Sequence, residues 1–180
     1  LEHEPGHSNA RFNLGRALIN LRDYAEAERV YVRFCADHPR DAEGFNHLGL
    51  SKMGLGDAVS AEPFFRASIR LVATDPLFHS NLAQALAHQG RHGEAESVYL
   101  EAARLDPESP RIRNQLGWFC ITRGNLDAAQ EYFEAARARS PGDVNALAGL
   151  AMVLERRGEL TAARVVLMPH IEAMPPHPKI

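Results

Sequence analysis

Hydrophobic and small residues recur along this chain at a fixed interval of 34 residues. One column holds leucine, a second holds alanine, and a third holds a large apolar side chain. The columns are Leu14, Leu48, Leu82, Leu116 and Leu150; Ala27, Ala61, Ala95, Ala129 and Ala163; and Tyr31, Phe65, Tyr99, Phe133 and Leu167. Such recurrence is typical of a helical repeat array, in which each unit is one supersecondary element stacked on the next.

Within each interval the apolar spacing predicts two amphipathic helices joined by a tight turn. We expect complete units at 8–41, 42–75, 76–109, 110–143 and 144–177, after the tail of a preceding unit over 1–7. First helices should begin near Asn9, Glu43, Leu77, Arg111 and Asn145, and second helices near residues 24, 58, 92, 126 and 160. The sequence therefore predicts one all-α array over 1–180, interpreted as an interior segment of a longer one.

The turns between paired helices fall in a glycine column, where a positive φ is easily adopted. That column is Arg22, Gly56, Gly90, Gly124 and Gly158, so the first turn should be strained or differently shaped. Asp23, Asp57 and Asn125 are predicted N-caps of the second helices. Pro63 predicts a late start, capped by Ser60, or a kink. Ala73, which replaces a closing proline, predicts a longer second helix in that unit.

Composition narrows the possible partners. The formal net charge is −3, and charges of both signs are interspersed, so no basic patch for nucleic acid is expected. No apolar run approaches the ~18 residues that a membrane span needs. The two cysteines, Cys35 and Cys120, lie in different units and are predicted to be buried and unpaired.

The scarcity of lysine hints at a bacterial source. A cytoplasmic location is favoured, and a periplasmic one fits a role in export.

The triplets NLG (13–15), HLG (47–49) and QLG (115–117) and the segments GEAESVYLEAARLDP (93–107) and GNLDAAQEYFEAARARSP (124–141) resemble the tetratricopeptide repeat. The resemblance covers nearly the whole chain. It implies a right-handed α-solenoid of five helix-turn-helix units with partial flanking units. It also implies a concave face, lined by the first helices, that commonly holds a peptide or a partner protein.

The resemblance assigns a set of first-helix residues to this groove, several of them amides that could hold the backbone of an extended peptide. A polar helix face directed to water is the alternative interpretation. The only tryptophan, Trp118, could be an interface anchor or could pack against Phe119 and Leu150. The candidate groove residues are Asn13, Arg16, Asn46, His47, Leu50, Asn81, Gln84, His88, Arg111, Asn114, Gln115, Trp118 and Met152.

One sharper family function can be tested on the sequence. Arrays that grip the acidic carboxy-terminus of heat-shock chaperones use a set of lysine, asparagine and arginine residues on three first helices. The matching positions here are Asn46, Leu50, Asn81, Arg111 and Gln115. Only Asn81 and Arg111 conform, so binding of such acidic tails is disfavoured.

Catalytic and metal motifs find little support. No nucleophile elbow, phosphate-binding loop or dinucleotide turn is present. His88 and His92 have the spacing of metal ligands, but Gly90 at the predicted turn separates them. We therefore expect a non-enzymatic scaffold without cofactor or metal, which binds a protein or peptide and could self-associate through its ends. The alternatives are the substrate-positioning array of a glycosyl- or sulfotransferase-like enzyme and an assembly subunit of a bacterial secretion or polysaccharide-export system.

Overall fold

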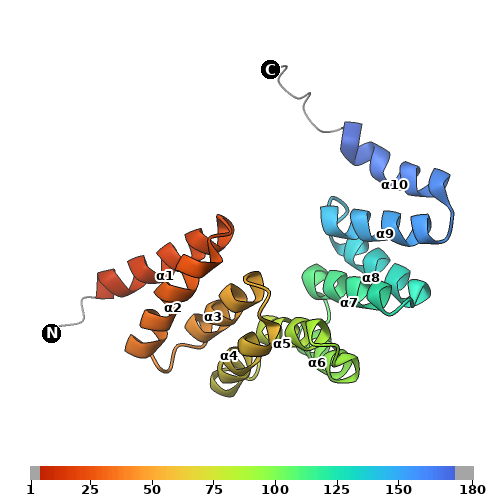
Figure 1. Ribbon diagram of the computed structural model, residues 1–180. Coiled ribbons are helices and arrows are strands. Elements are labelled where there is room, and N and C mark those ends of the chain that lie inside the picture. Colours follow the sequence, from red (N-terminus) through yellow and green to blue (C-terminus); the bar gives the residue numbers. More distant parts are fainter. Residues whose placement is uncertain (1–4, 173–180) are drawn as a thin grey trace. The chain divides into compact units, whose positions relative to one another are not determined.

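The computed structural model describes the backbone of residues 5–172, and within them the chain forms ten α-helices (Figure 1). Their lengths are nearly uniform, because each helix occupies half of one 34-residue interval. The bounds are α1 Pro5–Asn20, α2 Tyr24–Asp37, α3 Ala42–Gly54, α4 Ala58–Leu71, α5 Pro76–His88, α6 His92–Leu105, α7 Pro110–Thr122, α8 Leu126–Arg139, α9 Val144–Arg156 and α10 Leu160–Glu172.

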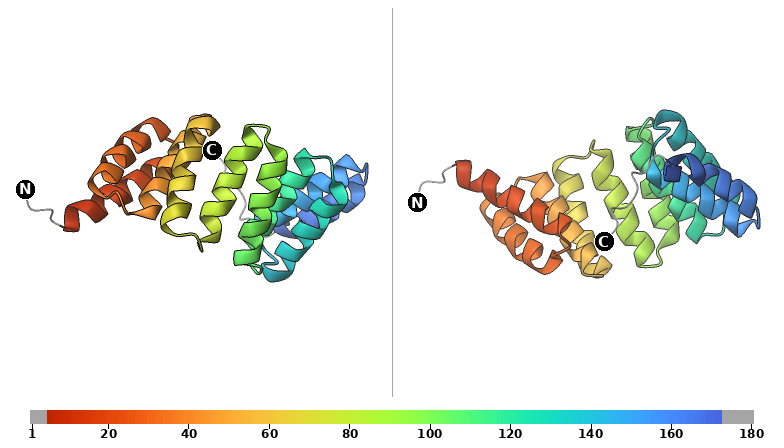
Figure 2. Two further views of the ribbon diagram at one scale, coloured as in Figure 1. Left: turned by 90° about the horizontal axis from the view of Figure 1, so that it is seen from below. Right: turned by 90° about the horizontal axis from the view of Figure 1, so that it is seen from above.

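The helices belong to two compact units, one within Leu1–Leu105 and one within Asp106–Ile180. The first unit contains α1 to α6 and the second contains α7 to α10. Within each unit every helix packs against the next along the chain, and first helices also contact one another, as α7 contacts α9 (Figure 2). The predicted division into five repeat units of a single array stays a prediction.

The predicted second-helix starts are confirmed at residues 24, 58, 92, 126 and 160. The predicted N-caps are confirmed as well: Asp23 accepts from the backbone N–H of Glu26, Asp57 from that of Ser60, and Asn125 from that of Ala128. A side-chain oxygen at this position satisfies a donor that has no partner within the helix. The caps explain why the helices begin where they do.

Three local predictions are wrong. Helix α4 begins at Ala58, so the predicted late start is wrong; Pro63 lies inside the helix, where it cannot donate to the carbonyl of residue 59, and the alternative prediction of a kink stays a prediction. The same helix ends at Leu71, with the usual 14 residues, because the N–H of Val72 closes it on the carbonyl of Ser68. The first helix was predicted to begin near Asn9, after a tail over 1–7, but α1 begins at Pro5, a position that suits proline.

The first turn has the same shape as the others, although it carries an arginine. Arg22 has a φ of 61°, and the four turn glycines have φ between 75° and 81°. Its hydrogen bonds match too: the N–H of Arg22 donates to Ile19 and that of Asp23 to Leu18, as Gly56 donates to Met53 and Asp57 to Lys52. The turn is therefore strained but not differently shaped.

Buried aromatic rings fill the space between paired helices. Tyr31, Phe65 and Phe133 are fully buried and pack where glycines leave room on the first helices. Leu48, Leu82, Leu116 and Leu150 are buried, but Leu14 is 53% exposed. Leu48 packs on Tyr31 and Phe34 of the preceding second helix. Leu14 is exposed because no described second helix precedes α1. Neither cysteine forms a disulfide; Cys35 is buried, whereas Cys120 is only half-buried.

Candidate functional site

A cavity of about 570 Å³ lies in the second unit, between α7, α9 and the loop that joins α8 to α9. Helix α7 supplies most of its wall, because Arg111, Asn114, Gln115 and Trp118 are spaced by three and four residues and share one helix face. The lining residues are Pro110, Arg111, Asn114, Gln115, Trp118, Ser140, Asp143 and Asn145. Four of the residues predicted for the groove are therefore brought together here.

Asp143 organises the polar side of this cavity. It is the N-cap of α9, and its Oδ1 accepts from the backbone N–H groups of Asn145, at 2.8 Å, and Ala146, at 3.3 Å. Its Oδ2 accepts from Nδ2 of Asn114 at 2.8 Å. A carboxylate can only accept hydrogen bonds, so this contact fixes the Asn114 amide with its nitrogen toward Asp143. The oxygen of that amide is then available for another donor.

Two amide oxygens in the cavity have no hydrogen-bond partner among the described residues. They are Oδ1 of Asn114 and Oε1 of Gln115, and both atoms are buried. The side chain of Asn114 is only 5% exposed, and Gln115 is half-buried. A buried acceptor without a donor costs free energy, typically about 1–3 kcal/mol. Two residues of the cavity lining therefore carry buried acceptors that have no partner in the described part of the chain.

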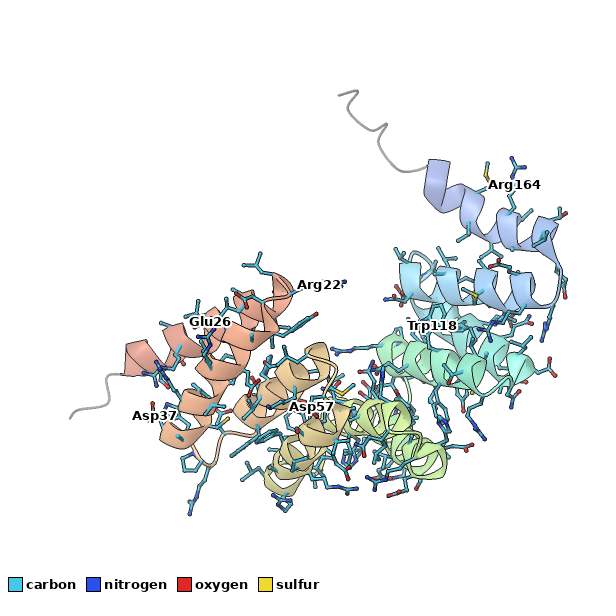
Figure 3. The ribbon with its side chains drawn as sticks, viewed as in Figure 1. Arg22, Glu26, Asp37, Asp57, Trp118 and Arg164 are labelled. Carbon is cyan, nitrogen blue, oxygen red and sulfur yellow. The ribbon has the colours of Figure 1, made fainter. Side chains whose placement is uncertain are left out.

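Trp118 forms the apolar part of the wall (Figure 3). Its ring meets that of Phe133 edge to face at 5.3 Å between centroids, and it packs against the core cluster that includes Leu150. The ring is half-buried and also lines the cavity, so packing near Leu150 is confirmed and a role as an interface anchor stays a prediction. Packing orients the ring, which reduces the entropy that a ligand contact would cost.

The charges around the cavity nearly balance. Arg111 contributes one exposed positive charge and Asp143 one negative charge. The first turns of α7 and α9 also face this region, and helix N-termini carry partial positive charge. The carboxylate of Asp143 offsets the partial positive charge at the N-terminus of α9. Net charge therefore does not select a strongly cationic or anionic ligand.

The predicted amides of the first unit behave differently. Nδ2 of Asn81 donates to Oδ1 of Asn46 at 2.8 Å, and both side chains are buried, at 2% and 6% exposure. This pair joins α3 to α5. These amides are thus committed largely to internal packing.

His47 is also part of the packing of the first unit. Its ring stacks on Tyr31 at 5.2 Å and meets Phe12 edge to face at 5.0 Å, while Nδ1 contacts the carbonyl oxygen of Glu43. Burial lowers the pKa of this histidine. It is therefore a neutral inter-helix residue at physiological pH.

The other predicted groove residues do not line the cavity of the second unit. Asn13, Arg16 and His88 are exposed, Leu50 and Gln84 are half-buried, and Met152 packs at the edge of the core on α9. Sequence reasoning missed Ser140, Asp143 and Asn145. The only signal for Asp143 was its place directly before a first helix, in a column with the capping residues Asp41 and Asp75.

The first unit has a second cavity, of about 560 Å³, between α4, α5 and α6. Three of its polar side chains have partners in the protein. Arg66 pairs with Glu62, Glu101 pairs with Arg104, and Nε2 of His79 contacts the carbonyl oxygen of Ala73. This cavity lacks the unsatisfied acceptors of the first one, so the cavity beside α7 is the stronger candidate.

Among the described residues, no three histidine, cysteine, aspartate or glutamate side chains gather closely enough to hold a metal ion. None of the ten described helices combines the length and apolar character that crossing a bilayer requires.

Comparison with known families decides the identity of the fold. Two family profiles, both described as tetratricopeptide repeat, match residues 120–180 and residues 1–42, 12–76 and 48–110. The chain belongs to the tetratricopeptide repeat family. Its all-helical structure has the solenoid fold of that family, as the sequence predicted.

Curated relatives are much longer proteins. The chain is 27% identical over 184 residues to cellulose synthase 1 operon protein C of Komagataeibacter xylinus, an alignment that covers 92% of the chain and 14% of the relative. It is 30% identical over 108 residues to human protein O-mannosyl-transferase TMTC2, with 58% of the chain and 13% of the relative covered. These tetratricopeptide proteins thus match the chain over a small part of their length.

Solved structures share the fold. TTC0263, a thermophilic tetratricopeptide protein of Thermus thermophilus, superposes with a TM-score of 0.85 at 20% identity and covers 94% of the chain and 93% of its own. PilF of Pseudomonas aeruginosa has a TM-score of 0.77 at 20% identity, with 93% and 77% covered. MamA has a TM-score of 0.68 at 21% identity, with 88% and 92% covered. At this identity the likeness concerns the fold alone.

Proposed function

We propose that this chain is a non-catalytic scaffold that binds an extended segment of a partner protein in the cavity beside α7. The observation that carries the proposal is the convergence of four groove residues, Arg111, Asn114, Gln115 and Trp118, on one cavity with two unsatisfied acceptors. A peptide supplies both the apolar side chains that a tryptophan binds and the donors that the amides lack. Tetratricopeptide arrays generally act as such scaffolds.

The experiment compares a blocked cavity with a matched surface change. Peptides are first selected from a phage-displayed dodecapeptide library on the wild-type chain. Their Kd is then measured for Asn145→Phe, which adds bulk at the exposed rim of the cavity, and for Glu131→Phe, which adds the same bulk on the exposed face of α8. We expect Asn145→Phe to weaken binding by about tenfold or more and Glu131→Phe to leave it unchanged. Equal Kd values for both variants would contradict the proposal.

A second candidate role has support from the relatives. Three curated relatives are cellulose synthase operon proteins C, from Komagataeibacter xylinus and Pseudomonas fluorescens. The scaffold could thus serve an assembly that makes or exports a polysaccharide. Deleting the gene in its source organism tests this role, with secreted polysaccharide as the readout. Unchanged secretion would argue against it.

The transferase alternative has one supporting relative, the human protein named O-mannosyl-transferase TMTC2. In that case the array would position a substrate for a catalytic domain elsewhere in the same protein. The full coding sequence tests the idea directly. A transferase domain in the same reading frame supports it, and its absence from the complete protein removes it.

A further inference from the structure

The cavity of about 560 Å³ in the first unit has walls from two second helices, α4 and α6, and a floor from α5. Both walls pack on α5, but in the part of the chain that the structure describes they do not pack on each other (Figure 1). The apolar part of the lining is Ile69, Leu82 and Val98, one residue from each helix. The volume lies within the range of about 300–1,000 Å³ that is usual for ligand pockets.

The equivalent place one repeat earlier is covered by two aromatic rings. There Phe45 and Phe64 pack against the core cluster that contains Leu48, the leucine of the same column. The residues 34 positions after these two rings are His79 and Val98. Valine has no ring, and the Nε2 of His79 is held by the carbonyl oxygen of Ala73 at 2.8 Å. The cavity therefore occupies a space that aromatic side chains of the protein cover in the preceding interval.

One wall of this cavity carries a positive charge that has no partner. Arg66 and Arg70 lie one turn apart on α4, and Nε of Arg66 donates to Oε1 of Glu62 at 2.8 Å. Arg70 is exposed and forms no ion pair with any described residue. On the opposite wall both carboxylate oxygens of Glu101 accept from Arg104 at 2.8 Å. A carboxylate of a ligand thus finds an accessible guanidinium, whereas a cationic ligand finds the acid of the described lining already paired.

We propose that this cavity is a second docking surface, which binds an aromatic side chain of a partner protein together with a neighbouring aspartate or glutamate. The aromatic ring fills the space beside Val98, and the carboxylate pairs with Arg70. A fatty acid also combines a carboxylate with an apolar part, but the rings of the preceding interval favour an aromatic side chain. The surface is separate from the cavity beside α7 and does not depend on the proposed function.

The test follows the δ1 methyl group of Ile69 by NMR in the full chain, because Ile69 lies in the cavity lining. The methyl group of Ile112, buried in the other unit, is the internal control. The first probe is acetyl-Gly-Asp-Phe-Asp-Gly-amide. A second peptide has asparagine in place of both aspartates, and a third has alanine in place of phenylalanine. Decanoate, a carboxylate on an acyl chain, is the fourth probe.

Two pairs of protein variants separate the aromatic contact from the charge. Val98→Phe places in the cavity the residue that Phe64 supplies one repeat earlier, and Val98→Ala, which widens the cavity, is its control. Arg70→Gln removes the charge, and Arg33→Gln, at an exposed arginine of α2, is its control. We expect Val98→Phe to weaken binding of the first peptide by about tenfold or more. Arg70→Gln should weaken it by about threefold and leave the asparagine peptide unaffected.

The peptide changes should act in the same way. Replacing phenylalanine by alanine should weaken binding by about tenfold, and replacing the aspartates by asparagine by about threefold. Combined with Arg70→Gln, the second change should have no further effect, as expected for a double-mutant cycle on one contact. Neither control variant should change the Kd by more than about twofold.

Four results would overturn the proposal. They are an unshifted Ile69 methyl resonance with the first peptide, equal Kd values for the aspartate and asparagine peptides, unchanged binding to a folded Val98→Phe protein, and tighter binding of decanoate than of the peptide. The last result would indicate a site for a lipid carboxylate. Circular dichroism checks that Val98→Phe is folded. If it is not, the cycle with Arg70→Gln decides, because that side chain is exposed.

Discussion

Replacing Arg22 by glycine should stabilise the protein. Arg22 lies in the left-handed region, with φ at 61°, where the other four turns of the same kind have glycine. A non-glycine residue there costs roughly 1–2 kcal/mol. Glycine removes that cost but adds freedom to the unfolded chain, which costs about 0.5–1 kcal/mol. The expected net gain is therefore about 0.5–1 kcal/mol.

The structure gives little reason for a compensating loss. The side chain of Arg22 is exposed, and the backbone hydrogen bonds of this turn have the same partners as those at Gly56 (Figure 3). The reverse change, from glycine to alanine, can be made at Gly90 without a steric clash, because a Cβ added there would meet nothing within 4 Å. It therefore measures the free-energy cost of the positive φ alone. Gly90→Ala should thus cost about 1 kcal/mol through φ alone.

The assay is thermal and urea unfolding followed by far-ultraviolet circular dichroism, because the only tryptophan is in the other unit and would not report on this turn. A gain of this size raises the Tm by about 2 °C for a chain of this length. Arg22→Ala is the control, since it removes the side chain and keeps the strained backbone. An Arg22→Gly protein no more stable than Arg22→Ala would refute the reasoning.

Three further predictions concern packing, ionisation and capping. Gly49→Val should destabilise by about 1–3 kcal/mol in urea unfolding, because a Cβ there would lie 2.6 Å from the buried ring of Phe65; Gly93→Ala, where the space is open, should not destabilise. Burial raises the pKa of the Cys35 thiol from 9.0 to about 12. Since the unfolded thiol ionises first, the free energy of unfolding should fall as pH rises above about 9, and Cys35→Ala should reduce that fall between about pH 9 and 10. Asp143→Ala should cost about 1–2 kcal/mol by removing a helix cap, measured as a lower Tm by tryptophan fluorescence. Unchanged unfolding of Gly49→Val or Asp143→Ala, or an unchanged pH dependence in Cys35→Ala, would contradict the corresponding prediction.

Periodicity predicted the helices well because every unit repeats the same local signals. The caps at Asp23, Asp57 and Asn125 were readable since a side chain and its backbone partner lie only three residues apart. The predicted late start of α4 was wrong because it weighed only the local free-energy cost of placing Pro63 inside a helix. In the folded protein the cap at Asp57 and the buried ring of Phe65 fix the start of α4, and one lost hydrogen bond does not shift it.

Only the part of the candidate site that lies on α7 could be predicted from the sequence. The family resemblance assigned Arg111, Asn114, Gln115 and Trp118 to the groove face of a first helix. Asp143, which determines what Asn114 offers, lies 29 residues away, and only the fold brings the two side chains together. No pattern within a single helix carries that information. Asp143, which the structure shows to be the N-cap of α9, is therefore also the group that orients the Asn114 amide.

Asn46 and Asn114 occupy equivalent positions, 68 residues apart, and both are buried. Their partners differ in kind. Asn46 accepts from another amide, Asn81, which could equally donate or accept, so that pair can exchange roles. Asn114 meets a carboxylate that can only accept, so its oxygen is left buried without a partner among the described residues. The same residue in the same column is thus a packing element in one unit and a directed acceptor in the other. Asn114→Leu should therefore weaken peptide binding beside α7, whereas Asn46→Leu should act on the stability of the first unit alone.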